Sequence, residues 1–182
     1  MQPLRIAVVV GSTREGRVGD DIARWVAGVA GLRTGVEPVL VDLVDYDLPA
    51  RYPRLPTPPV RRFAGEVARA DGFVVVTPEY NRSFPASLKQ AIDLAYDEWH
   101  AKPAGLVSYG YRTAGFHAVE QLRSVFTELH VTTVRDTVAV DLRDGRPLDS
   151  EDRVRAADAM LDQLTWWAEA LRDARRRRPY VS

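Results

Sequence analysis

Residues 4–22 read LRIAVVVGSTREGRVGDDI. The run Leu4–Val10 is short, apolar and rich in β-branched residues, and Pro3 and Gly11 bound it, which predicts a buried strand. A polar, glycine-rich turn then runs from Gly11 to Gly19. After the turn, apolar residues recur at helical spacing until Gly31, so we expect a helix there. The stretch therefore predicts a strand, a turn and a helix in direct succession.

The same succession recurs along the chain. We expect four more strands, at residues 36–41, 73–76, 106–108 and 132–140. Helical segments follow at residues 60–69, 85–96 and 116–129, and Ser150 is expected to cap a long last helix. Several prolines predict an irregular surface loop over residues 43–59.

Strands that alternate with helices predict a parallel sheet with helices on both faces. Five strands fit a flavodoxin-like three-layer α/β/α fold with strand order 2-1-3-4-5, and we expect residues 1–182 to form one such domain. In this fold a ligand crevice lies at the carboxyl ends of the strands, where the loops after strands one, three and four converge.

The composition narrows the classes of function. The chain has 182 residues and no cysteine, which excludes thiol nucleophiles and disulfides, and its 3 histidines lack the spacing of a metal site, so we expect no metal. The formal net charge is +0, which gives no reason to expect a nucleic-acid partner. Ile6–Val10 is too short for a signal peptide or a membrane span, so we expect a cytoplasmic protein without a membrane partner.

A run of four basic residues, Arg175–Arg178, ends the predicted last helix. We interpret it as cations that oppose the negative end of the helix dipole, and a nucleic-acid patch is the alternative.

The first loop has the features of an anion site. Backbone N–H groups at the start of a helix attract anions, and Ser12, Arg14 and Arg17 add side-chain donors. The loop is not a P-loop, because Arg17 and Val18 replace its lysine and hydroxyl residue, and it is not a dinucleotide fingerprint, because Arg14 stands where a glycine is required. It suits a terminal monophosphate; a tight turn is the alternative.

Two further loops are expected at the same edge of the sheet. Residues 77–85 carry prolines near both ends, an aromatic ring and an amide, and Gly110 in the next loop permits close backbone approach to a ligand. Residues 77–85 alone could equally be an ordinary polar loop. Together, the three loops predict a site for a mononucleotide that carries a planar ring.

Several of these motifs resemble the NADPH-dependent FMN reductases, which include quinone and azo-dye reductases. The resemblance rests on Gly11–Arg14, on Pro78–Asn81 followed by Ser83 and Pro85, and on the stretches 88–93, 98–103 and 107–110. It covers roughly Ile6 to Leu129.

The resemblance implies how FMN is held. It places the phosphate loop, with Ser12, Arg14, Arg17, Val18 and Gly19, around the FMN phosphate. It places Pro78, Glu79, Tyr80 and Asn81 beside one edge of the isoalloxazine, and Ser108, Tyr109 and Gly110 on its other side. Many members carry Ser or Asn where this chain has Arg17, Val18 and Gly19, so those contacts would come from the Arg17 side chain or from backbone.

The resemblance also implies a reaction. Hydride would pass from NADPH or NADH through FMN to a small electron acceptor: a quinone, an azo compound, a metal oxyanion or free flavin. The flavin carries the chemistry, so no catalytic side chain is expected. We interpret Glu79 as a backbone contact with a solvated carboxylate, and Arg82 and Arg112 as candidates for the 2′-phosphate of NADPH.

Three alternatives stay open at this point. One is a flavodoxin-type FMN electron carrier, and the second is a nucleoside-processing enzyme with Glu79 as nucleophile. The third treats FMN as a loosely held substrate.

The family resemblance further implies a homodimer or homotetramer. Trp99, between Glu98 and His100, is expected near the subunit interface, because tryptophan is favoured at interfaces.

Overall fold

The computed structural model describes residues 2–181 and contains a five-stranded parallel sheet. Its strand order is β2-β1-β3-β4-β5, and every neighbouring pair is parallel. The flavodoxin-like fold predicted from the alternation of strands and helices is confirmed. The strands are β1 (Leu4–Val10), β2 (Val36–Asp42), β3 (Gly72–Pro78), β4 (Pro103–Gly110) and β5 (Thr132–Asp141).

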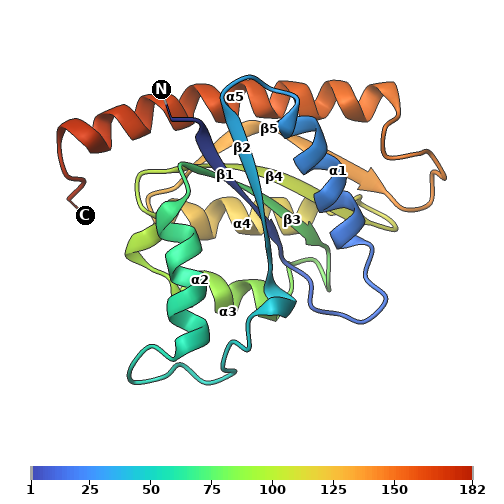
Figure 1. Ribbon diagram of the computed structural model, residues 1–182. Coiled ribbons are helices and arrows are strands. Elements are labelled where there is room, and N and C mark those ends of the chain that lie inside the picture. The colour runs from blue at the N-terminus through green and yellow to red at the C-terminus, as the bar shows by residue number, and fades with distance from the viewer. Residues whose placement is uncertain (1, 182) are drawn as a thin grey trace.

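Helices cover both faces of the sheet (Figure 1). Helices α1 (Gly19–Gly31) and α5 (Glu151–Arg177) lie on one face. The other face carries α2 (Pro58–Arg69), α3 (Ala86–Leu94) and α4 (Phe116–Glu128). Within residues 2–181, none of these helices has both the length and the apolar character that a bilayer crossing requires.

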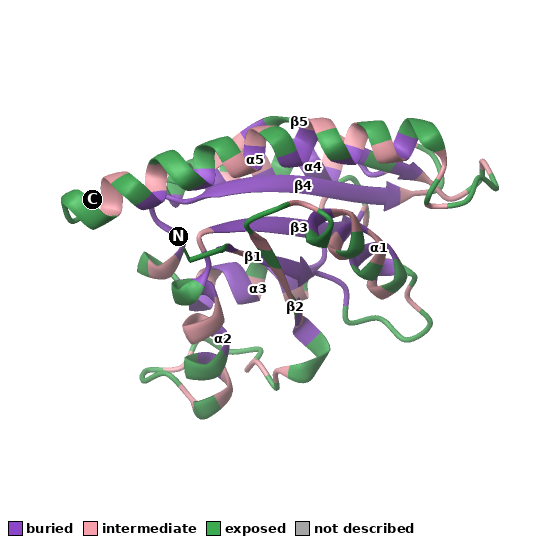
Figure 2. Ribbon diagram, turned by 45° about the horizontal axis from the view of Figure 1, so that its top comes forward, coloured by how far each residue is buried: buried purple, intermediate pink, exposed green. Residues whose placement is uncertain are grey.

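Alternating residues of the inner strands build two separate hydrophobic cores. On β1, Ile6 and Val8 pack toward α1 and α5, whereas Ala7 and Val9 pack toward α2, α3 and α4. This alternation follows from the two-residue period of a strand. Figure 2 shows β3 and β4 buried along their length, as expected for central strands of a parallel sheet.

The element boundaries differ in detail from the sequence expectations. Helix α2 begins at Pro58, because proline suits the first turn of a helix. Helix α3 ends at Leu94, and a separate 3₁₀ turn follows at Asp97–Trp99. The Ser150 side chain makes no capping hydrogen bond to α5, so that predicted contact is wrong although its position at the helix start is right.

The basic run at the end of α5 also makes a contact between elements. The Arg175 guanidinium donates to the Ala101 carbonyl and lies 3.6 Å from the Asp71 carboxylate. Asp71 directly precedes β3, so one cation of this run joins α5 to the sheet.

Trp99 does not lie on the surface of the molecule, so its expected place at an interface is wrong. Its side chain is 0% exposed and packs against Phe73, Phe63 and Phe126, with ring centroids 4.5, 6.4 and 5.6 Å away. Its Nε1–H donates to the Ile92 carbonyl over 3.2 Å. The 3₁₀ turn directs this ring into the core beneath α2 and α4.

We expect Trp99→Ala to lower the free energy of unfolding by about 3–5 kcal/mol, because truncating a buried tryptophan removes apolar burial and leaves a cavity. Urea denaturation followed by far-ultraviolet circular dichroism measures the change. Trp166→Ala is the matched control, since Trp166 is 63% exposed on α5 and its loss should change stability by only about 0.5 kcal/mol. Equal effects of the two substitutions would contradict the core position of Trp99.

Candidate functional site

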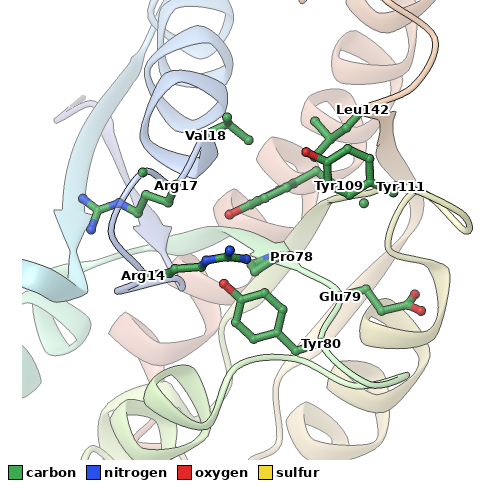
Figure 3. Close-up of a pocket in the computed structure, with 11 residues that line it drawn as sticks. Arg14, Arg17, Val18, Pro78, Glu79, Tyr80, Tyr109, Tyr111 and Leu142 are labelled. Carbon is green, nitrogen blue, oxygen red and sulfur yellow. The ribbon is translucent and has the colours of Figure 1, made fainter.

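A pocket of about 260 Å³ lies at the carboxyl ends of β1, β3 and β4, where the fold predicts a ligand crevice (Figure 3). Three loops and the segment after β5 form its wall. The lining residues are Arg14, Gly16, Arg17, Val18, Pro78, Glu79, Tyr80, Tyr109, Gly110, Tyr111 and Leu142. Most of the residues predicted for the site therefore meet in one pocket.

Four predicted site residues do not line this pocket. Ser12, Gly19 and Ser108 are buried behind it, and Asn81 is exposed on a turn beside it. Conversely, Gly16, Tyr111 and Leu142 line the pocket and were not selected from the sequence. One feature of the sequence could have indicated Leu142: it directly follows β5, which ends at the same edge of the sheet.

The first loop presents free backbone donors at the start of α1. The N–H groups of Thr13, Gly16 and Val18 donate no hydrogen bond to any described residue. Gly16 has a φ of +65°, which favours glycine. Unpaired N–H groups beside a helix N-terminus form a site suited to an anion.

The two arginines of this loop have different surroundings. Arg14 is exposed and has no ion-pair partner among residues 2–181, and its guanidinium extends over the pocket above Tyr80 (Figure 3). The Arg17 guanidinium instead donates to the Asp42 carboxylate over 2.5 Å and is turned away from the pocket centre. Arg14 is thus the arginine available to a ligand.

The loop after β3 forms a tight turn. Tyr80 and Ser83 exchange two backbone hydrogen bonds of 2.8 and 2.9 Å, and Asn81 and Arg82 between them have φ values of +50° and +65°. Both turn residues are exposed, whereas the Tyr80 ring reaches into the pocket. The Tyr80 hydroxyl shares a 3.1 Å hydrogen bond with Ser12 Oγ, which joins this loop to the first one.

Tyr109 and Gly110 form the opposite wall. Burial raises the pKa of the Tyr109 hydroxyl to about 12, so the phenol is neutral across the physiological range. A Cβ atom at Gly19 would lie 2.5 Å from this hydroxyl oxygen. Gly19 is therefore needed for packing beneath the first turn of α1. Ser108 also has a local partner, because its hydroxyl donates to the Ala114 carbonyl over 2.8 Å.

The carboxylate of Glu79 is engaged, so the expectation that it is solvated is wrong. It accepts hydrogen bonds from Thr113 Oγ1 at 2.6 Å and from the His117 N–H at 3.0 Å. Figure 3 shows the carboxylate directed away from the other side chains of the pocket. This geometry does not favour Glu79 as a nucleophile toward a ligand in the pocket.

The strand order and the pocket at the carboxyl ends of the strands define a flavodoxin-like class of protein. Residues 4–145 match the sequence profile of the NADPH-dependent FMN reductases, and the chain belongs to this family. The predicted family is confirmed.

Similar proteins support the assignment to this family. The chain is 38% identical over 130 residues to an NAD(P)H-dependent FMN reductase of Schizosaccharomyces pombe, covering 66% of this chain and 64% of that protein. It therefore spans slightly less than two thirds of the length of that relative. A 2-hydroxy-1,4-benzoquinone reductase from Burkholderia sp. is 29% identical over 179 residues, covering 90% of this chain and 96% of that protein.

Solved structures show the same fold. An oxidoreductase from Corynebacterium diphtheriae aligns with a TM-score of 0.78 at 16% identity, over 93% of this chain and 99% of that chain. The flavoenzyme FerB from Paracoccus denitrificans aligns with a TM-score of 0.74 at 23% identity, over 90% of this chain and 98% of that chain.

The residues of the pocket fit FMN. The unpaired N–H groups and the free Arg14 suit its phosphate, because oriented donors and an unpaired cation bind a dianion well. Tyr80, Tyr109 and Tyr111 supply aromatic surface for a planar ring, and Gly110 leaves space for its close approach.

Proposed function

We propose that this chain is an FMN-containing oxidoreductase that takes hydride from NADPH or NADH and reduces a small acceptor. The main observation in support of this proposal is the free Arg14 guanidinium, which extends over a pocket whose first loop has unpaired N–H groups. When bound, FMN supplies the redox chemistry and the protein supplies its position.

Each part of the site has a proposed role. Arg14 and the N–H groups of Thr13, Gly16 and Val18 hold the phosphate. Pro78, Tyr80, Tyr109 and Gly110 border the ring, as the lining of the pocket supports. Arg17 acts through its pair with Asp42, which fixes the shape of the loop. Ser12, Gly19, Asn81 and Ser108 support the loops from behind or beside the pocket.

A quinone is the acceptor that we propose first. The Burkholderia relative, which aligns over 90% of this chain, is named for reduction of a benzoquinone. Tyr111 lines the pocket yet remains 68% exposed, which offers an aromatic face to a second planar molecule at the mouth. Azo compounds, metal oxyanions and free flavin are the other acceptors to be compared.

Purified protein with FMN should oxidise NADPH in the presence of 1,4-benzoquinone without a partner reductase, measured by the loss of absorbance of NADPH. We expect lower activity with NADH at low nucleotide concentration, because exposed Arg82 and Arg112 beside the pocket can meet the 2′-phosphate. The double variant Arg82→Ala, Arg112→Ala should reduce this preference. Activity that requires an added reductase would favour the electron-carrier alternative.

We expect Arg14→Ala to weaken FMN binding about 10- to 150-fold, because hydrogen bonds to a charged group contribute about 1.5–3 kcal/mol. Riboflavin lacks the phosphate, so its affinity should hardly change. Quenching of flavin fluorescence measures both dissociation constants. Arg24→Ala is the matched control, since Arg24 is an exposed arginine of α1 that pairs with Asp20 and Asp21.

Comparing FMN with riboflavin separates the loss of a phosphate contact from general damage to the loop. Equal weakening of FMN and riboflavin would indicate general damage to the loop. Unchanged FMN affinity would leave the phosphate to backbone N–H groups and remove Arg14 from the proposed site.

We also propose that residues 1–182 form one domain that assembles as a cytoplasmic homodimer or homotetramer, as the family resemblance implies. Because Trp99 lies in the core, such an interface would use other residues. Light scattering at micromolar concentration should give at least the mass of a dimer, and a monomeric mass would refute this proposal.

A further inference from the structure

Helix α4 begins without a capping side chain of its own. Its N-cap residue is Gly115, which has a φ of +89°. A Cβ atom at Gly115 would lie 2.5 Å from the Ser108 Cβ atom, so this position cannot carry the Ser, Thr or Asp that usually caps a helix. The Phe116 N–H finds a local acceptor in the Thr113 carbonyl at 3.0 Å, but the next N–H of α4, that of His117, needs an acceptor from elsewhere in the chain.

Glu79 supplies that acceptor from the loop after β3. Its Oε2 atom accepts from the His117 N–H, in the first turn of α4, at 3.0 Å and from Thr113 Oγ1 at 2.6 Å. A carboxylate is well placed here, because the helix dipole favours negative charge at a helix N-terminus. We refer to these two hydrogen bonds as the Glu79 cap.

Glu79 also holds the other end of the same loop. Its backbone N–H donates to the Tyr109 carbonyl over 3.1 Å, where β4 ends. Glu79 thus contacts both ends of residues 110–115, in addition to the bonds of the Ser108 hydroxyl to the Ala114 carbonyl and of the Leu142 N–H to the Gly110 carbonyl. Gly110 and Tyr111 lie within this segment and line the pocket. Pro78 and Tyr80, on either side of Glu79, line the pocket as well.

We propose that Glu79 is a positioning residue that sets the gap between the two loops on either side of the flavin ring. It acts through the Glu79 cap, without its carboxylate facing the ligand. The effect on flavin binding rests on the proposed function, whereas the effect on the loop does not.

Three substitutions test the proposal. Glu79→Gln keeps the size of the side chain and removes its charge, Thr113→Val removes the hydroxyl donor, and Thr113→Ser keeps a hydroxyl. We expect Glu79→Gln and Thr113→Val each to weaken the binding of FMN and the binding of riboflavin by the same factor, about five- to tenfold, because a charge-assisted hydrogen bond is replaced or lost. Thr113→Ser should bind both flavins nearly as the parent does.

The double variant Glu79→Gln, Thr113→Val separates positioning from unspecific damage. Because both changes break one interaction, its affinity loss should be clearly smaller than the product of the two single losses. Glu128→Gln is the matched control, since Glu128 is an exposed carboxylate at the far end of α4, and it should change neither affinity.

Amide hydrogen exchange gives a readout that needs no flavin. In protein without added FMN, Glu79→Gln should speed exchange across residues 110–117 and leave the central strands unchanged. Parent-like flavin affinities and exchange rates in Glu79→Gln and Thr113→Val would overturn the proposal, as would a loss of FMN affinity alone. If the parent protein binds no flavin, the proposed function fails, and the exchange rates alone decide whether the Glu79 cap holds the loop.

Discussion

Burial of the central strands on both faces is the constraint on which the rest of this structure depends. Strands β3 and β4 offer almost no exposed side chain along their length, so polar chemistry is confined to the loops at their ends. Because the strands are parallel, the loops after β1, β3 and β4 emerge at one edge, and the loop after β5 joins them through Leu142. The pocket is therefore a consequence of strand order, and the side chains of the loops decide what it binds.

Much of the fold and part of the site could be predicted from local patterns. Apolar β-branched runs such as Phe73–Val76 identify the inner strands, and the alternation with helices then leaves few topologies open. Arg14 and Tyr80 follow strand ends and Gly110 ends β4, so local features of the sequence suffice to predict their position at the pocket.

The remaining features depend on contacts between distant segments. The pair of Arg17 with Asp42 and the bonds of Glu79 to Thr113 and His117 join residues 25 to 38 positions apart, which no local pattern reveals. The predicted surface position of Trp99 is wrong for the same reason. Its charged neighbours suggested the surface, but the backbone of a 3₁₀ turn directs the ring into a cluster formed by β3, α2 and α4.

The sheet also divides the interior into two hydrophobic compartments that share a backbone but few side-chain contacts. Substitutions in one compartment should alter packing there and leave the other nearly undisturbed, as energetic effects add when residues have no common neighbours. Over evolutionary time, the side beneath α1 and α5 can then accumulate changes independently of the side beneath α2, α3 and α4. Such independence lets sequences diverge widely while the strand ends, and the loops that they carry, keep their places.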